Sequence, residues 1–412
     1  MRPAMELADL EVLVVAPPPP GWGGRWWVIP KVTTKCGVTG YGECYASAID
    51  PHVLARVCAD VFARHMAGTS PFDVALMARR VWGSGFTGRP DPTVWGAFAG
   101  MEIACWDIMG KALDVPCWQL LGGRLNARLR AYTYLYPDDG GNDHADGFWT
   151  DPDAQAAVAA KRADEGWTAV KLDPSGPYTI RGGHQPGRRD IALSAAMAGA
   201  VRAAVGDRAD ILWGTHGQFT ASGAVRLAQA LVPHDPLWFE EPCPPDDPHA
   251  LAHVARSQPI PVAAGERLCG LSEFAQLLRA GGASILQPAL GRLGGLREGA
   301  RLAALAEGFG AQLAPHLYCG PVEFAASVQL GTAIPNLLMV EAIESPFHHA
   351  LASGPRVEGG FVRAPDAPGL GIAFDEDLAR ANPYSGDRLH LEMQEAAHDP
   401  SILPSFAGGA AD

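Results

Sequence analysis

Two glutamates, Glu240 and Glu266, follow two predicted β-strands, and their carboxylates could share one metal ion. They are 26 residues apart, the length of about one strand, one helix and two loops. Mg²⁺ takes oxygen ligands and keeps waters at its other positions, so two carboxylates on adjacent strand ends suit it. The structural alternative is that Glu240 belongs to a solvated strand end and that Glu266 pairs with a nearby arginine.

Side chains that can carry protons follow further predicted strands. A histidine moves protons at physiological pH. A dication beside Lys171 would lower the pKa of its ammonium group and make it a base. The structural alternatives are a core histidine at 316 and an ion pair of Lys171 with Glu240 or Glu266. The polar side chains at or just after the predicted strands are Lys171, Asp173, His216, Glu240, Glu266, Gln287, His316 and Glu341.

Eight short β-rich runs position these side chains. Segments rich in Ala, Leu and Arg, such as 224–231 and 296–306, lie between most of the runs. Such alternation is typical of a (β/α)₈ barrel, in which active-site residues lie at the C-terminal ends of the strands. The runs are 131–135, 169–172, 210–213, 237–239, 260–263, 284–286, 312–314 and 337–340.

The front and the tail of the chain have other patterns. Strand-like stretches broken by turns extend to about residue 60. From about 94 to 113, apolar residues recur at steps of four and three, which places them on one helix face. The tail from about 345 to 375 is rich in Gly and Pro. We therefore expect an N-terminal domain before the barrel and a tail that returns to it.

The composition disfavours several classes of function. The 412 residues carry a formal net charge of −13 without a Lys/Arg-rich block, which disfavours nucleic-acid binding. No apolar run reaches the roughly 18 residues of a membrane span. Glu6, Asp9 and Glu11 interrupt the apolar stretch that a secretory signal would need. The eight cysteines form no CxxC pair, as is usual for reduced thiols. We expect a soluble cytoplasmic enzyme that binds neither nucleic acid nor membranes.

Several motifs, in order and at barrel spacing, resemble the enolase superfamily, in particular its mandelate-racemase-like sugar-acid branch. The resemblance covers most of the chain. It implies an α+β capping domain at 1–125, a modified TIM-type (β/α) barrel with the active site at 126–345, and a C-terminal return to the capping domain with a tail at 346–412. The motifs include Val38–Glu43, Met101–Ala112, Gln119–Gly123, Lys171–Asp173, Trp238–Pro242 and Ala264–Arg267.

The resemblance also implies a reaction. The family abstracts a proton α to a carboxylate and stabilises the enediolate with Mg²⁺. A sugar-acid dehydratase, a hydro-lyase, would then yield a 2-keto-3-deoxy acid from a small-molecule carboxylate substrate. Lys171 or His316 would remove the α-proton, and His316 or His216 would protonate the leaving β-hydroxyl. The resemblance also suggests a homo-oligomer.

Two rival functions stay open. A cycloisomerase or epimerase of a sugar acid or its lactone would use the same enediolate with a different outcome. A catalytically silent binding protein would have kept the fold and lost part of its ligand set.

One departure from the family concerns the metal ligands. The family usually takes an Asp from the end of the third barrel strand, where this chain has Gly214. Strand ends two and three are neighbours in a barrel, so we hypothesise a metal site of Asp173, Glu240 and Glu266. The alternative is that Asp173 only begins a turn with the following proline. His216 is a further candidate ligand, although imidazole suits softer ions better than Mg²⁺.

A second departure concerns His316. Many members of the branch hold this histidine with an Asp on the sixth strand, where this chain has Ala289. Such an Asp fixes the imidazole tautomer and raises its basicity. Without this Asp we expect His316 to be a weaker base, which either acts as a general acid or finds another partner, such as Glu341.

Overall fold

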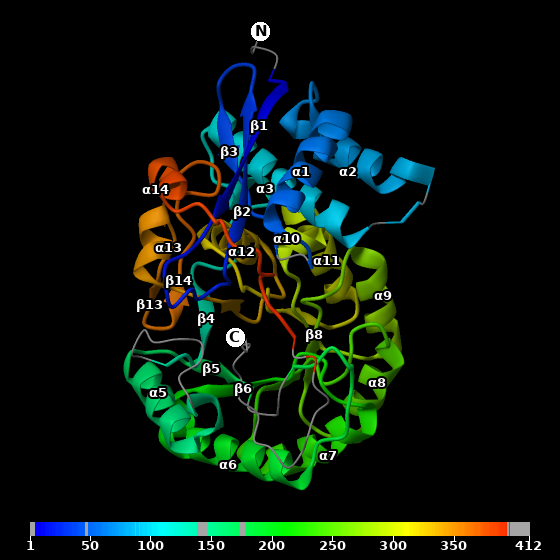
Figure 1. Cartoon of the computed structure of the whole chain (residues 1–412), viewed down its shortest axis with the longest axis vertical. Helices are drawn as coiled ribbons and strands as arrows, with labels where there is room; N and C mark the ends of the chain where they lie inside the picture. The colour runs from blue at the N-terminus through cyan, green and yellow to red at the C-terminus, as the bar shows by residue number, and fades with distance from the viewer. Residues whose placement is uncertain are drawn as a thin grey trace.

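The computed structural model describes residues 5–45, 48–86, 88–89, 91–137, 147–173, 178–393 and 395. Figure 1 shows a ring of strands and helices in the lower part of the molecule, and a sheet with helices above it. The predicted fold class, an α+β capping domain with a modified (β/α) barrel, is confirmed.

The barrel is built from parallel strands in chain order. Each strand from β4 to β10 pairs with the next, and β11 pairs back with β4. The backbone N–H of Leu338 donates to Leu313 O, and that of Leu313 donates to Asn336 O, which connects the region before β11 to β10. All the predicted runs contain a strand or lead into one, but the last strand starts at Val340 instead of 337. The strands are β4 (Leu129–Tyr134), β5 (Ala169–Leu172), β6 (Asp210–Gly214), β7 (Trp238–Glu240), β8 (Val262–Ala264), β9 (Ile285–Leu286), β10 (Gln312–Leu313) and β11 (Val340–Glu341).

Helices surround this ring, as Figure 1 shows for α5 to α9. Several begin with an aspartate or threonine cap and a proline, which fix the start of a helix. Asp247, for example, accepts hydrogen bonds from the first turn of α8. The helices are α5 (Pro152–Asp164), α6 (Arg188–Val205), α7 (Ala221–Leu231), α8 (Pro248–Ser257), α9 (Leu271–Ala280), α10 (Leu290–Leu293), α11 (Gly295–Gly308) and α12 (Pro321–Ala333).

A layer of buried side chains packs together beneath the strand ends. It includes two aromatic rings in edge-to-face contact, those of Tyr132 and Trp238, with centroids 5.2 Å apart. Such a filled interior confines the polar side chains to the C-terminal ends of the strands. The cluster is Tyr132, Ala169, Leu212, Trp238, Ala263, Ile285, Ala314 and Met339.

The capping domain packs a three-stranded antiparallel sheet against a long buried helix, α3. A Cβ on Gly42 would lie 1.8 Å from the carbonyl oxygen of Gly100, so only glycine allows this close approach to α3. No described helix is both long and apolar enough to cross a membrane. The elements are β1 (Leu7–Val15), β2 (Trp27–Thr34), β3 (Thr39–Tyr41), α1 (Pro51–Val61), α2 (Val74–Gly83), α3 (Pro92–Leu113) and α4 (Cys117–Leu120).

The tail contacts both parts of the molecule. A hairpin of β13 and β14 pairs with β4. Glu376 in α14 lies 2.7 Å from Lys31 of the capping sheet. The domain boundaries themselves stay a prediction, and residues 396–412 of the predicted tail lie outside the described residues. The tail elements are α13 (Pro346–Leu351), β12 (Ala352–Ser353), β13 (Val357–Glu358), β14 (Phe361–Val362), β15 (Ala373–Phe374) and α14 (Glu376–Ala381).

Buried glutamates of the capping domain hold the first turns of barrel helices. Glu102 in α3 accepts backbone hydrogen bonds from Leu296 at 2.8 Å and Arg297 at 3.1 Å, at the start of α11. Glu43 accepts one from the backbone of Glu323 in α12 at 3.0 Å. Burial raises the pKa of both Glu43 and Glu102 to about 8. These contacts fix the capping domain over the barrel mouth.

Replacing Glu102 by alanine is expected to lower the free energy of unfolding by about 3 kcal/mol. The change leaves the backbone donors of Leu296 and Arg297 and the indole of Trp106 without an acceptor. Urea unfolding followed by circular dichroism measures the effect, and Glu307→Ala, an exposed position in α11, is the matched control. Equal stability of the two variants would contradict this role of Glu102.

Candidate active site and metal centre

The predicted site residues converge at the C-terminal ends of the barrel strands. Lys171 is the residue before the last in β5, Glu240 ends β7 and Glu341 ends β11, whereas Glu266 and His316 follow β8 and β10 closely. The exposed fractions of these five residues lie between 1% and 4%. So many buried ionisable groups are costly unless they pair with one another or with an ion.

Lys171 is clamped between two carboxylates. Its Nζ donates to Glu240 Oε1 at 2.6 Å and to Glu341 Oε1 at 3.3 Å. Burial opposes the charge of Lys171, but the carboxylates of Glu240 and Glu341 outweigh it and raise the lysine pKa. The lowered pKa that we expected near a dication is thus not produced by the protein's own groups, which act in the opposite direction.

Glu240 is held firmly on its other side. Its Oε2 accepts hydrogen bonds from Gln287 Nε2 at 2.7 Å and from Trp238 Nε1 at 3.0 Å. Gln287, at the end of the strand next to β8, therefore positions Glu240. These contacts fix the orientation in which Glu240 presents its carboxylate to Lys171.

Glu341 lies beside His316. The sequence suggested Glu341 as a partner of this histidine because position 289 holds Ala instead of Asp. Its Oε2 lies 2.9 Å from His316 Nδ1 and accepts the backbone N–H of Leu317 at 2.8 Å. Burial opposes ionisation of Glu341, but Lys171 and His316 lower its pKa to about 2. Burial also opposes the charge of His316, but Glu266, whose Oε2 is 3.2 Å from Nδ1, and Glu341 raise the histidine pKa. The two carboxylates favour a proton on Nδ1.

The other ring nitrogen of His316 contacts the capping domain. Its Nε2 lies 3.0 Å from the hydroxyl of Tyr45, which is buried. The guanidinium of Arg292 stacks over the Tyr45 ring, with Cζ 4.6 Å from the ring centroid. Tyr45 is not among the site residues predicted from the sequence. Its contact joins segments 271 residues apart, so no local pattern in the sequence indicates it.

Asp173 and His216 form a second pair on the neighbouring strand ends. Asp173 Oδ2 lies 2.8 Å from His216 Nδ1, and the hydroxyl of Tyr178 lies 2.6 Å from the same nitrogen. Burial raises the pKa of Asp173 to about 6, and His216 partly offsets that rise. Burial opposes the charge of His216, but Asp173 and Glu266 outweigh it and raise the histidine pKa. Sequence reasoning did not identify Tyr178.

Three of these side chains can converge on one ion. His216, Glu240 and Glu266 each offer a ligand atom, and these atoms lie within 4.8 Å of one another. Among the described residues, Asp173 Oδ1 is buried and accepts no hydrogen bond, and Glu266 Oε2 faces only His316 Nδ1 at 3.2 Å. Buried carboxylate oxygens with so few donors, beside a nitrogen–oxygen donor set, fit a divalent cation.

The predicted set of Asp173, Glu240 and Glu266 differs from this group by one residue. His216 stands in the group, and Asp173 contacts His216. Asp173 as a direct ligand stays a prediction.

The backbone of His216 has an unusual conformation. Its φ is +49°, a left-handed value that is uncommon for residues with a side chain and is often found at functional sites. Glu241, beside Glu240, shares it with φ +42°.

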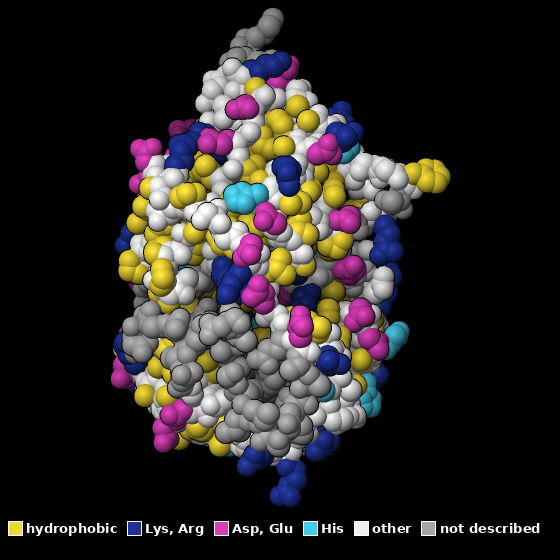
Figure 2. Space-filling model, viewed as in Figure 1, with side chains coloured by type: hydrophobic (Ala, Val, Ile, Leu, Met, Phe, Trp, Pro, Cys, Tyr) yellow, Lys and Arg dark blue, Asp and Glu magenta, His cyan; other side chains and the backbone are white. Residues whose placement is uncertain are grey.

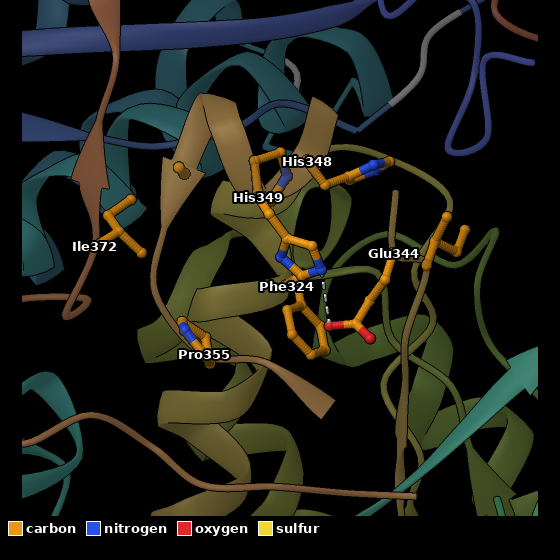
Figure 3. A pocket seen from close by; sticks show the side chains of 9 residues that line it. Phe324, Glu344, His348, His349, Pro355 and Ile372 are labelled. Atoms are coloured by element: carbon orange, nitrogen blue, oxygen red, sulfur yellow. Dashed lines mark ion pairs between the residues drawn. The ribbon is translucent and has the colours of Figure 1, made fainter. Parts of the chain in front are cut away.

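A pocket between α12 and the tail is separate from this site. Figure 3 shows it near α13, where His349 Nε2 pairs with Glu344 Oε1 at 3.6 Å. Its lining also includes Phe324, His348 and Ile372, and none of the strand-end residues above.

On the face shown in Figure 2, outside the grey atoms, Lys and Arg side chains are interspersed with Asp and Glu.

Comparisons with known proteins agree with the architecture. The family described as "Mandelate racemase / muconate lactonizing enzyme, N-terminal domain" matches residues 23–122, and "Enolase C-terminal domain-like" matches residues 153–378. The chain is 31% identical to the D-xylonate dehydratase of Haloferax volcanii, over 94% of this chain and 91% of that protein. It is 32% identical to the D-galactonate dehydratase of Ralstonia pickettii, over 85% and 90%.

A solved structure is similar over almost the whole chain. The mandelate racemase/muconate lactonizing enzyme-like protein from Roseovarius sp. TM1035 is 58% identical. It superposes with a TM-score of 0.94 and covers 96% of this chain and 100% of its own. The shared fold therefore includes the capping domain as well as the barrel.

Proposed function

The chain belongs to the mandelate racemase and muconate lactonizing enzyme family of the enolase superfamily, and from this premise we propose that it is a cation-dependent dehydratase of a sugar acid. Relatives that share about a third of its residues are named D-xylonate and D-galactonate dehydratases. Such enzymes are hydro-lyases, in agreement with the enzyme class expected from the sequence.

The proposed reaction removes water from carbons 2 and 3 of an aldonic acid. His316 takes the proton from C2, which leaves an enediolate. The C3–O bond then breaks, and the hydroxyl departs as water with the proton that His316 carries. The enol that results becomes a 2-keto-3-deoxy acid. One general base therefore serves both halves of the reaction, and no other reactant is needed.

The contact that carries this proposal is that of Glu341 with His316. Glu341 Oε2 lies 2.9 Å from Nδ1, so a proton is favoured there and Nε2 is left to exchange protons with the substrate. Lys171 contacts the same glutamate at 3.3 Å and is held charged, so its ammonium group supports a substrate carboxylate. Glu341 thus takes the role that an Asp at Ala289 would have.

His216, Glu240 and Glu266 would hold the cation, which the family resemblance predicts to be Mg²⁺. When bound, a divalent ion withdraws negative charge from the substrate carboxylate and so acidifies its α-proton. The protein's own acids keep Lys171 charged nearby. A negatively charged chain can therefore still bind an anionic substrate at this site.

A panel of aldonic acids and their lactones, supplied with Mg²⁺ or Mn²⁺, tests the proposal through formation of 2-keto acid. We expect at least one aldonic acid to be dehydrated. Epimerised acid without keto acid would show an epimerase, and a lactone opened without loss of water a cycloisomerase. No turnover together with no exchange of the α-proton would instead identify a binding protein.

Replacing Tyr45 by phenylalanine is expected to lower kcat by about 10-fold with little change in KM, because only a hydrogen bond to the base is lost. Steady-state kinetics on the accepted acid measures this. Tyr384→Phe is the matched control, because Tyr384 is similarly buried and its hydroxyl contacts only the backbone of Arg388. Equal kcat in both variants would remove Tyr45 from the site.

A further inference from the structure

The end of β6 supplies no side chain for an ion, and the structure leaves little room for one. A Cβ on Gly214 would lie 3.3 Å from Asp173 Cβ and 3.3 Å from Lys171 Cε. Both neighbours are buried, so a carboxylate side chain at 214 would have to displace them. A ligand from this part of the barrel must therefore come from another residue.

His216 lies two residues further and has one ring nitrogen to offer. Its Nδ1 is engaged by the Tyr178 hydroxyl at 2.6 Å and lies 2.8 Å from Asp173 Oδ2. Nε2 is therefore the nitrogen left for an ion. Histidines that bind metals commonly have their other ring nitrogen held by a carboxylate or another polar group.

A second observation points to a ligand. Asp173 is 3% exposed and Glu266 is 4% exposed. Within the described part of the chain, Asp173 Oδ1 accepts no hydrogen bond. Asp173 Oδ2 faces His216 Nδ1 at 2.8 Å, and Glu266 Oε2 faces His316 Nδ1 at 3.2 Å. A buried carboxylate oxygen without a donor is costly, and a positive ion beside these carboxylates would remove that cost.

We propose that this site selects a borderline first-row ion such as Mn²⁺ over Mg²⁺, bound by His216 Nε2, Glu240 and Glu266, with Asp173 and Tyr178 positioning the imidazole. The proposal rests on the cation-dependent function above and names the ion that serves it. The ligand set follows from the residues after β6, where His216 stands in place of a third carboxylate.

The preference follows from charge and ligand type. A neutral imidazole in place of a third carboxylate lowers the negative charge of the site by one, which weakens the mainly electrostatic binding of Mg²⁺. Imidazole nitrogen binds first-row transition ions well, and their affinity for a mixed nitrogen–oxygen site is lowest for Mn²⁺, rises to Cu²⁺ and falls again at Zn²⁺. Mn²⁺ also accepts carboxylates readily, so it is the probe of choice.

The direct test is the electron spin echo of Mn²⁺ bound to the whole protein after removal of metals with a chelator. Modulation by a directly bound ¹⁴N nucleus is expected in the wild type and in His253→Asn, an exposed position in α8. It should be absent in His216→Asn. Modulation that persists in His216→Asn, or that is missing in the wild type, would overturn the proposal.

Affinities give an independent readout. Mn²⁺ should bind the wild type at least about 10-fold more tightly than Mg²⁺ in a competition titration, and His216→Asn should reduce that ratio. Asp173→Asn should weaken Mn²⁺ binding by about 10-fold and keep the ¹⁴N signal. Tighter Mg²⁺ binding, or a ratio unaffected by His216→Asn, would overturn the proposal. Loss of all binding in Asp173→Asn would do so too, because Asp173 would then be a ligand itself.

These outcomes separate the ion from the reaction. Dehydration supported by Mg²⁺ in a protein without the ¹⁴N signal would refute the ion proposal and keep the proposed function. A ¹⁴N signal in a protein that dehydrates no sugar acid would support the ion proposal and refute the proposed function.

Discussion

Replacing His316 by asparagine is expected to lower kcat for sugar-acid dehydration by about 10³-fold. KM should change little. His316 is the one proposed base, and its two ring nitrogens contact Glu341 at 2.9 Å and Tyr45 at 3.0 Å. An asparagine side chain cannot accept the α-proton, whereas the substrate still meets Lys171 and the cation ligands. Steady-state kinetics on the aldonic acid found in the panel gives the measurement.

The matched control is His253→Asn, because His253 is exposed in α8 and should leave kcat unchanged. Metal binding should also survive in His316→Asn, since His316 is not in the group of candidate ligands. A kcat within about 10-fold of the wild type would assign proton abstraction to another residue, of which Lys171 is the first to examine.

The second large effect is expected for Glu341→Gln, with kcat lowered by about 10²-fold. Glu341 contacts His316, Lys171 and the backbone of Leu317, so it positions the base without touching the reacting carbon itself. Removing its charge should also shift the pH profile. Glu266 and Glu341 raise the pKa of His316, so without Glu341 the histidine loses its proton at lower pH. The rising limb of kcat/KM should therefore move to lower pH.

A purely structural role for Glu341 would lower the amount of folded protein and leave that limb in place. Glu344→Gln serves as the matched control, since Glu344 lies three residues further and pairs with His349 in a separate pocket. An unchanged pH profile in Glu341→Gln would contradict the positioning of His316 by Glu341.

The fold, and the gathering of the candidate site residues at one edge of the barrel, could be predicted because barrel spacing is regular. Alternating β-rich and helical runs locate strand ends, and parallel strands bring Lys171, Glu240 and Glu266 to the same edge whatever the loops do. The last strand was placed too early because the apolar run from Leu337 extends into it. Only Val340 and Glu341 of this region pair with β4.

The contacts that orient the site could not be predicted in the same way. Asp173 directly follows β5, and His216 lies two residues after β6. The conformation of these two short segments decides which of the two side chains points toward an ion, and the sequence does not specify that conformation. Tyr45 comes from the capping domain, and Tyr178 lies beyond the strand end. Such partners depend on packing between distant segments, which the periodicity of the sequence does not indicate.

The most direct test of the account follows the proton at C2 of the accepted sugar acid by ¹H NMR in D₂O. With the cation-loaded wild type, the C2 signal should disappear as the 2-keto-3-deoxy acid forms. With His316→Asn, the C2 proton should remain through the same time and no keto acid should appear. Loss of the C2 proton at the wild-type rate in His316→Asn would contradict the account, because proton abstraction would then not depend on His316 held by Glu341.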